Sequence, residues 1–128
     1  MGVISSGLRQ ALEWAMPGVP FDFVEANELV VDRGEIVGYR IRVPFEGKGE
    51  VLSRVASSLG VPASRIAVVG DDVNDLSMFR LPVGLRIAFH PRSREVEEEA
   101  DLVVWGDLRE ASDAILKWFG LRRTARQR

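Results

Sequence analysis

The stretch Ile66-Ala67-Val68-Val69-Gly70-Asp71-Asp72-Val73-Asn74-Asp75 (residues 66–75) determines how the rest of the chain is interpreted. Its first four residues form a continuous apolar run, which is typical of a parallel strand buried on both faces of its sheet. Three carboxylates and an amide follow within five residues of Gly70. Open α/β sheets bind ligands at the carboxyl ends of their strands. The stretch therefore predicts a buried strand that ends in a polar, ligand-binding loop.

The segments on either side alternate between strands and helices. Residues 27–43 predict a β-hairpin, because Asp32-Arg33-Gly34 suits a tight turn and the return strand alternates apolar and basic side chains. The alternation of strands and helices along the chain predicts an α/β fold, with a parallel sheet covered by helices on both faces and the hairpin as an appendage. The expected strands are 3–5, 66–69, 85–89 and 102–105, separated by a turn at 6–7 and by helices over 8–16, 49–59, 74–80, 94–100 and 109–119.

The composition restricts the class of protein. The chain has 128 residues, of which 46% are hydrophobic and 28% charged, and this predicts one domain over 1–120 with a basic tail at 121–128. A formal net charge of −2 gives no reason to expect a nucleic acid or a membrane surface as partner. The absence of cysteine excludes disulfides and thiolate nucleophiles. The first six residues lack the features of a signal peptide, so we expect a cytoplasmic protein.

The acidic loop admits two interpretations. Asp71, Asp72 and Asp75 crowd like charges together, and a divalent cation held by Asp71 would relieve the repulsion. Mg²⁺ prefers such hard oxygen ligands. Alternatively, Asp72 and Asp75 complement the dipole at the N-terminus of the helix that follows. Taken alone, these residues favour neither interpretation.

Two further features could bind an anion. Ser5, followed by Ser6 and Gly7, offers a hydroxyl and backbone N–H groups at the start of a helix, where a serine also serves as a simple N-cap. Lys48 lies between two glycines and is one of two lysines in the chain. Lysine suits a phosphate as a mobile point charge, although a loop lysine is usually solvated. The three tryptophans lie in apolar stretches and are expected in the core: Trp14, Trp105 and Trp118.

These three features, in this order, resemble the later motifs of the haloacid dehalogenase superfamily. Val3-Ile4-Ser5-Ser6-Gly7 resembles its second motif, Gly47-Lys48-Gly49 its third, and residues 68–79 its fourth. The hairpin that begins at Ala26-Asn27-Glu28-Leu29 resembles the phosphoserine phosphatase branch. The resemblance covers roughly residues 3–116 and implies a three-layer, Rossmann-like core.

The resemblance also implies a role for each motif residue. Asp71 and Asp72 would bind Mg²⁺, with Asp72 standing where this branch usually has glycine. Lys48 and Asp75 would be catalytic, the lysine neutralising charge and the aspartate supporting the lysine or the metal. The substrate would be a small phosphorylated metabolite, phosphoserine by resemblance to the branch. The phosphate-binding residues would be Ser5, Ser6, Gly7, Lys48 and Asn74.

The first motif of the superfamily has no counterpart here. That motif is a pair of aspartates that act as nucleophile and as acid and base, and only four residues precede Ser5. The superfamily places the missing strand between the strand that ends at Ser5 and the one that ends at Asp71. We expect the gap to be filled by a complementing N-terminal half, by a strand exchanged within a homo-oligomer, or by a rearranged sheet.

Two functions are consistent with this pattern. The first is a Mg²⁺-dependent phosphomonoesterase that is inactive or incomplete alone, because the nucleophile and the helical cap are absent. The second is a non-catalytic domain that binds phosphate, Mg²⁺ or a protein partner.

Overall fold

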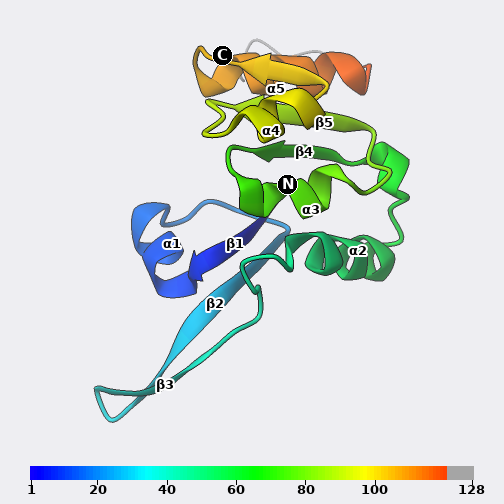
Figure 1. Cartoon of the computed structure of the whole chain (residues 1–128). Coiled ribbons are helices and arrows are strands. Elements are labelled where there is room, and N and C mark those ends of the chain that lie inside the picture. Colours follow the sequence, from blue (N-terminus) through cyan, green and yellow to red (C-terminus); the bar gives the residue numbers. More distant parts are fainter. Residues whose placement is uncertain (121–128) are drawn as a thin grey trace.

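The computed structural model describes residues 1–120, so the predicted basic tail at 121–128 lies outside the described residues (Figure 1). None of the helices in the described part has the length and hydrophobicity needed to cross a membrane. The elements in chain order are β1 (Gly2–Leu8), α1 (Arg9–Ala15), β2 (Phe23–Asp32), β3 (Glu35–Arg40), α2 (Lys48–Leu59), η1 (Ala63–Arg65), β4 (Ala67–Gly70), η2 (Val73–Asp75), α3 (Leu76–Phe79), β5 (Leu85–Phe89), α4 (Arg94–Glu99), β6 (Leu102–Val104) and α5 (Leu108–Trp118).

The strands form two three-stranded sheets, ordered β1-β2-β3 and β4-β5-β6. Strands β4, β5 and β6 are parallel, as are β1 and β2, whereas β2 and β3 form the antiparallel hairpin. The predicted α/β fold with parallel strands and crossover helices is therefore confirmed. The expected interruption of the sheet also lies where it was predicted, between the strand that carries Ser5 and the strand that precedes Asp71.

Helices cover the second sheet on both faces. On one face, Val68 of β4 and Ala88 of β5 pack with Leu52 of α2 and Phe79 of α3 in the main hydrophobic cluster. On the other face, α5 packs against β5 and β6 in a smaller cluster centred on Ile87, Val104 and Ala111. Figure 1 shows α5 at one end of this layered body and the hairpin at the other.

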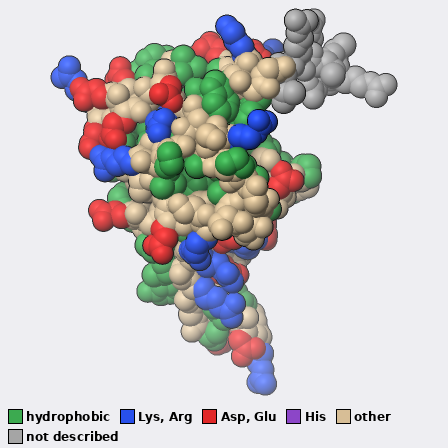
Figure 2. All heavy atoms as spheres, turned by 90° about the vertical axis from the view of Figure 1, so that its right-hand side faces the viewer, with side chains coloured by type: hydrophobic (Ala, Val, Ile, Leu, Met, Phe, Trp, Pro, Cys, Tyr) green, Lys and Arg blue, Asp and Glu red, His purple; other side chains and the backbone are tan. Residues whose placement is uncertain are grey.

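The hairpin projects away from the body (Figure 1). Its turn is tight because Arg33 and Gly34 both adopt positive φ angles, 52° and 80°, as a two-residue type I′ turn requires. Figure 2 shows Lys and Arg side chains gathered along the hairpin. Apolar side chains are exposed there as well, including Ile36 and Tyr39.

The structure corrects several expectations about burial and boundaries. Trp14, Trp105 and Trp118 are not core residues, because their side chains are exposed. Leu59, an apolar residue at the end of the helix expected over 49–59, is exposed too. The turn expected at 6–7 is instead part of β1, which continues to Leu8. Apolar periodicity predicts which side chains lie on the apolar face of an element. It does not show whether another segment packs against that face.

Candidate phosphate and metal site

A buried ion pair lies at the centre of the candidate site. The Nζ atom of Lys48 is 2.7 Å from Oδ1 of Asp75. The two side chains are almost fully buried, with exposed fractions of 8% and 4% for the whole residues. Lys48 begins α2, and Asp75 ends η2 just beyond β4, so two separate segments supply the pair. The alternative of a solvated loop lysine is therefore wrong.

The second oxygen of Asp75 organises the loop that follows β4. Oδ2 accepts hydrogen bonds from the backbone N–H groups of Asp71 and Asp72, at 2.9 and 3.2 Å. Burial alone would raise the pKa of Asp75, but the hydrogen bonds from Lys48 and from the two amides together hold this pKa below its ordinary value of 3.8. The carboxylate is thus ionised at neutral pH. A Cβ at Gly70 would lie 2.6 Å from that of Asp75, so the loop needs a glycine there.

Asp72 lies at the start of a helix, as one of the two interpretations of the acidic loop predicted. Its Oδ1 accepts a hydrogen bond from the N–H of Val73 at 2.7 Å, and it forms a capping box with Asp75 at the start of η2. The helix-start interpretation therefore holds for Asp72. One of its oxygens remains outside this bond.

Asp71 has a side chain that is accessible to a ligand. It is about half exposed, and its Oδ2 lies 3.3 Å from Nε of Arg92 in a surface ion pair. Within residues 1–120 no group of three or more His, Cys, Asp or Glu side chains could hold a metal ion. Mg²⁺ commonly binds through one or two carboxylates, with waters and substrate phosphate completing its shell. Asp71 and Asp72 therefore fit one side of a magnesium site.

The serines of β1 do not cap a helix. Oγ of Ser5 accepts a hydrogen bond from the N–H of Gly7 at 3.0 Å, and α1 has Leu8 at its N-cap without any side-chain bond. The N-cap interpretation is therefore wrong. Oγ of Ser6 is buried and has no hydrogen-bond partner among the described residues. An unpaired buried hydroxyl is uncommon in a finished fold.

Asn27 connects β1 to the segment that leads to the lysine. Its Nδ2 donates to the carbonyls of Ser6 and Val43, at 2.9 and 3.1 Å. Its Oδ1 accepts from the N–H groups of Arg42 and Val43, at 2.8 and 2.9 Å. One side chain thus fixes the end of β1 against the loop before Lys48. The only signal for Asn27 in the sequence is its place in the branch motif, which assigned it no role.

A second close contact positions the start of α2. The N–H of Gly49 donates to Oγ of Ser77 at 2.9 Å. A Cβ at Gly49 would lie 2.5 Å from the carbonyl oxygen of Ser77. The glycine after Lys48 therefore lets α2 approach α3, and this approach brings the lysine to Asp75.

The motif residues are thus only partly assembled. Lys48, Asp71, Asp72 and Asp75 form one connected group, and Asn74 lies half-buried in the same loop. No hydrogen bond within residues 1–120 joins Ser5, Ser6 or Gly7 to that group. Asn27 links Ser6 to the segment before Lys48, and β1 also contacts α2 directly.

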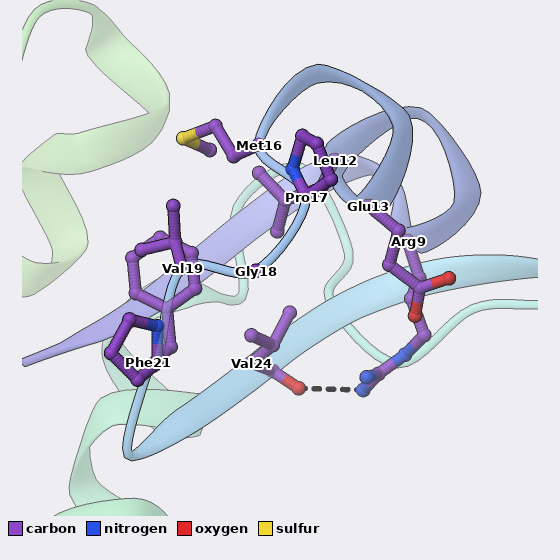
Figure 3. Close-up of a pocket in the computed structure, with 10 residues that line it drawn as sticks. Arg9, Leu12, Glu13, Met16, Pro17, Gly18, Val19, Phe21 and Val24 are labelled. Carbon is purple, nitrogen blue, oxygen red and sulfur yellow. Dashed lines mark hydrogen bonds between the residues drawn. The ribbon is translucent and has the colours of Figure 1, made fainter.

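The hollows on the surface lie elsewhere. One, of about 230 Å³, lies between α1 and the segment that follows it, with Leu12, Met16 and Phe21 in its lining. Figure 3 shows that the Arg9 guanidinium in this hollow points at the carbonyl of Val24, to which it donates at 2.6 Å. None of the predicted site residues lines this hollow or the second one, near Val55. The candidate site lies outside both of these hollows.

Comparison with known proteins gives one consistent family. Residues 39–118 match the model of the haloacid dehalogenase-like hydrolases. Phosphoserine phosphatase SerB2 of Mycobacterium tuberculosis is 40% identical over 103 residues, covering 76% of this chain and 24% of that protein. Phosphoserine phosphatase of Methanocaldococcus jannaschii is 33% identical over 118 residues, covering 86% and 53%.

A solved phosphoserine phosphatase in its apo form shares the fold. It superposes with a TM-score of 0.75 at 32% identity, covering 88% of this chain and 56% of that one. The chain therefore spans between about a quarter and about half of the relatives it matches.

Proposed function

Because this chain belongs to the haloacid dehalogenase-like hydrolases, we propose that it forms the phosphate- and metal-binding part of a Mg²⁺-dependent phosphomonoesterase. Its substrate would be a small phosphorylated metabolite. Phosphoserine is the first candidate, since phosphoserine phosphatases are among the relatives that match most of the chain.

The observation that carries this proposal is the buried pair of Lys48 and Asp75. A buried ion pair is costly to desolvate and gives little net stability. Here it holds a lysine at the carboxyl ends of parallel strands, where such sheets bind ligands. Asp75 accepts a hydrogen bond from the backbone of Asp71 as well as from Lys48, so it links the lysine to the loop that carries the proposed metal ligands. This arrangement supports phosphate binding better than it supports a purely structural role.

Each group of residues would bind a different part of the ligand. Asp71 and Asp72 would hold Mg²⁺, which would supply positive charge to the phosphate oxygens. Lys48 would share its remaining donors with the phosphate while Asp75 keeps it in place. Ser5, Ser6 and Gly7 would provide a hydroxyl and backbone N–H groups to the same oxygens. Asn74 lies in the loop between the two groups.

The nucleophile is expected from outside these residues. The 128-residue sequence contains no Asp-X-Asp pair. We therefore expect the chain alone to bind Mg²⁺ and phosphate without hydrolysing phosphoserine.

Binding can be tested directly by isothermal titration of the chain with MgCl₂ and then with inorganic phosphate in the presence of Mg²⁺. Asp71→Asn should weaken Mg²⁺ binding at least about tenfold, because a single carboxylate ligand is lost. Asp32→Asn, at the exposed tip of the hairpin, is the matched control and should bind as wild type does. Equal binding of Mg²⁺ by Asp71→Asn and wild type would refute the assignment.

The alternative is a non-catalytic domain that binds phosphate, Mg²⁺ or a protein. It is favoured by the 128-residue sequence itself, which holds Lys48, Asp71 and Asp75 but no Asp-X-Asp pair. The chain can be mixed with the part of a related phosphoserine phosphatase that it does not match. Hydrolysis of phosphoserine by this mixture would support the phosphatase function. Binding without hydrolysis under those conditions would decide for the alternative.

A further inference from the structure

We propose that Arg92 is an anion-binding residue of the candidate site and that it couples phosphate binding to metal binding. In the structure its guanidinium group is paired with Asp71. Once the Asp71 carboxylate is bound to a divalent cation, the guanidinium group turns to the phosphate. The inference deepens the proposed function, on which it rests for the identity of the two ligands. It adds a residue that lies outside all of the predicted motifs.

Arg92 is joined to Asp71 at two points. The backbone N–H of Arg92 donates to the carbonyl oxygen of Asp71 at 2.7 Å. Nε of Arg92 lies 3.3 Å from Oδ2 of Asp71. The two residues follow β4 and β5, which are neighbouring parallel strands, so both segments emerge at the same edge of the sheet. The sheet itself therefore places a guanidinium group beside the candidate metal ligand.

The backbone on both sides of Arg92 is fixed. Before it, the N–H of His90 donates to the carbonyl of Val104 at 2.9 Å. After it, Ser93 caps α4 by accepting a hydrogen bond from the N–H of Val96 at 3.3 Å, and Val96 is fully buried. With its own N–H bound to Asp71, Arg92 has an anchored main chain. A change of partner would therefore involve its side chain and not the segment as a whole.

The side chain of Arg92 is free to make such a change. It is 72% exposed, and the Asp71 side chain is 50% exposed. An exposed ion pair contributes little to stability, because water screens both charges and the side chains lose conformational freedom. The guanidinium group can therefore leave Asp71 at little cost when a better partner is present.

Charge determines when the change occurs. The Asp71 carboxylate that faces Arg92 is also the proposed ligand of the divalent cation, and two positive groups at one carboxylate repel each other. Arg92 therefore opposes Mg²⁺ binding in the absence of an anion. A phosphate group between the two cations attracts both, and arginine binds phosphate oxygens through two parallel N–H donors. Arg92 thus makes Mg²⁺ binding and phosphate binding depend on each other.

A nearby arginine shows what an ordinary surface pair looks like in the same region. Arg94 lies two residues further along the chain and pairs with Glu98 of the same helix, also at 3.3 Å. Both of these side chains are exposed, and Glu98 belongs to no predicted site. Arg92 and Arg94 therefore share charge, exposure and position in the chain but differ in the carboxylate that they face. Arg94 is the matched control.

The test compares Arg92→Met with Arg94→Met by isothermal titration calorimetry at constant ionic strength. Each variant loses one exposed positive charge and retains an unbranched side chain. The full 128-residue chain is titrated first with MgCl₂ and then, at saturating Mg²⁺, with inorganic phosphate. Circular dichroism of both variants checks that each one folds.

The expected changes for Arg92→Met have opposite signs. Without phosphate it should bind Mg²⁺ at least about threefold more tightly than wild type, because a competing cation is lost. With Mg²⁺ present it should bind phosphate at least about tenfold more weakly, because a charge-assisted hydrogen-bond donor is lost. Arg94→Met should match wild type in both titrations. A residue that only supported Asp71 would weaken the binding of both ions when removed.

A second readout follows the guanidinium group itself. In ¹H–¹⁵N spectra of the wild-type chain, the Nε–H signal of Arg92 should shift on addition of MgCl₂ and shift again on addition of phosphate, because its partner changes. In Asp71→Asn the first of these shifts should be absent, because the carboxylate that links Arg92 to the cation is lost.

Three results would overturn the inference while leaving the proposed function intact, provided that the wild-type chain binds both ions. They are unchanged binding by Arg92→Met, equal changes in Arg92→Met and Arg94→Met, and weaker binding of both ions by Arg92→Met alone. A wild-type chain that binds neither Mg²⁺ nor phosphate would instead reject the proposed function, and the role of Arg92 with it.

Discussion

At the scale of single residues, Lys48 and Asp75 act as a unit. Lys48→Met leaves the Asp75 carboxylate buried with two amide donors but no counter-charge, which should lower the free energy of unfolding by about 3 kcal/mol. The double variant Lys48→Met/Asp75→Asn should cost less than the sum of the two single changes. Urea denaturation measures all three.

An exposed pair provides the control for this cycle. Arg94 and Glu98 lie 3.3 Å apart on the surface of α4. Arg94→Met should change the free energy of unfolding by less than about 0.5 kcal/mol. If Lys48→Met and Arg94→Met lowered the free energy of unfolding equally, the buried pair would contribute no more to stability than the exposed one.

Asp75 also predicts how stability depends on pH. Its pKa in the folded state is held below the ordinary value of 3.8, so the unfolded chain takes up this proton first as the pH falls. The stabilisation is complete above about pH 5 and is lost as the pH drops through 3.8 towards the lower folded value. Asp75→Asn, although less stable at pH 7, should show a shallower loss over this range in urea titrations. Parallel curves for the two proteins would contradict the assignment.

Asn27 is the residue whose role only the structure shows. Asn27→Asp keeps acceptors for Arg42 and Val43 but loses both donors, so the carbonyls of Ser6 and Val43 lose their bonds. We expect a loss of about 1–3 kcal/mol in the free energy of unfolding. Calorimetry should also show weaker binding of inorganic phosphate with unchanged binding of Mg²⁺, since Asp71 lies on a different segment. An equal loss of both would mean a general structural role.

At the scale of elements, the contact between α2 and α3 depends on the absence of a Cβ at Gly49. In an ordinary helix Gly→Ala is stabilising, by up to about 1 kcal/mol. Gly49→Ala should instead destabilise by about 1–3 kcal/mol, because its Cβ would lie 2.5 Å from the Ser77 carbonyl. Gly38→Ala, in β3 with nothing within 4 Å, is the control and should be close to neutral. Thermal unfolding compares the two.

The elements themselves were largely predictable from the sequence. The strand expected over 66–69 and the helix expected over 49–59 correspond closely to β4 and to α2, which ends at the cap residue Gly60 with a φ of 67°. Local patterns specify such features because strand burial and glycine caps are local physics. The extent of β1 through Gly7 was not predictable, since its pairing with β2 is a long-range contact.

For the candidate site, the sequence predicted that Lys48 and Asp75 act together, and the structure joins them across 27 residues. The hydrogen bonds around this pair were not predictable. The sequence left Asp72 open as a metal ligand or a helix-start residue, and the structure places it at the start of η2 while Asp71 faces Arg92. The tryptophans were predicted to be core residues but are exposed. Their apolar sequence context is the same whether or not another segment packs against them.

At the scale of the whole molecule, the central fact is that the sheet is interrupted where the site lies. The main cluster packs around α2, α3, β4 and β5, whereas β1 joins it through Ile4. The body from α2 to α5 therefore has its own core, and the β1–β2–β3 sheet depends on fewer contacts. Amide exchange in the chain alone should accordingly be faster in β1 than in β5.

The separation of Lys48 from Asp75 along the chain has a kinetic consequence. The two residues are 27 positions apart, whereas Ile4 of β1 packs against a cluster whose members begin at Leu52, and the entropic cost of closing a segment grows with its length. The lysine, its aspartate and the loop around Asp71 would therefore form early in folding, before the distant β1 docks. β1 would then dock onto a preformed template, with the loop around Asp71 already in place.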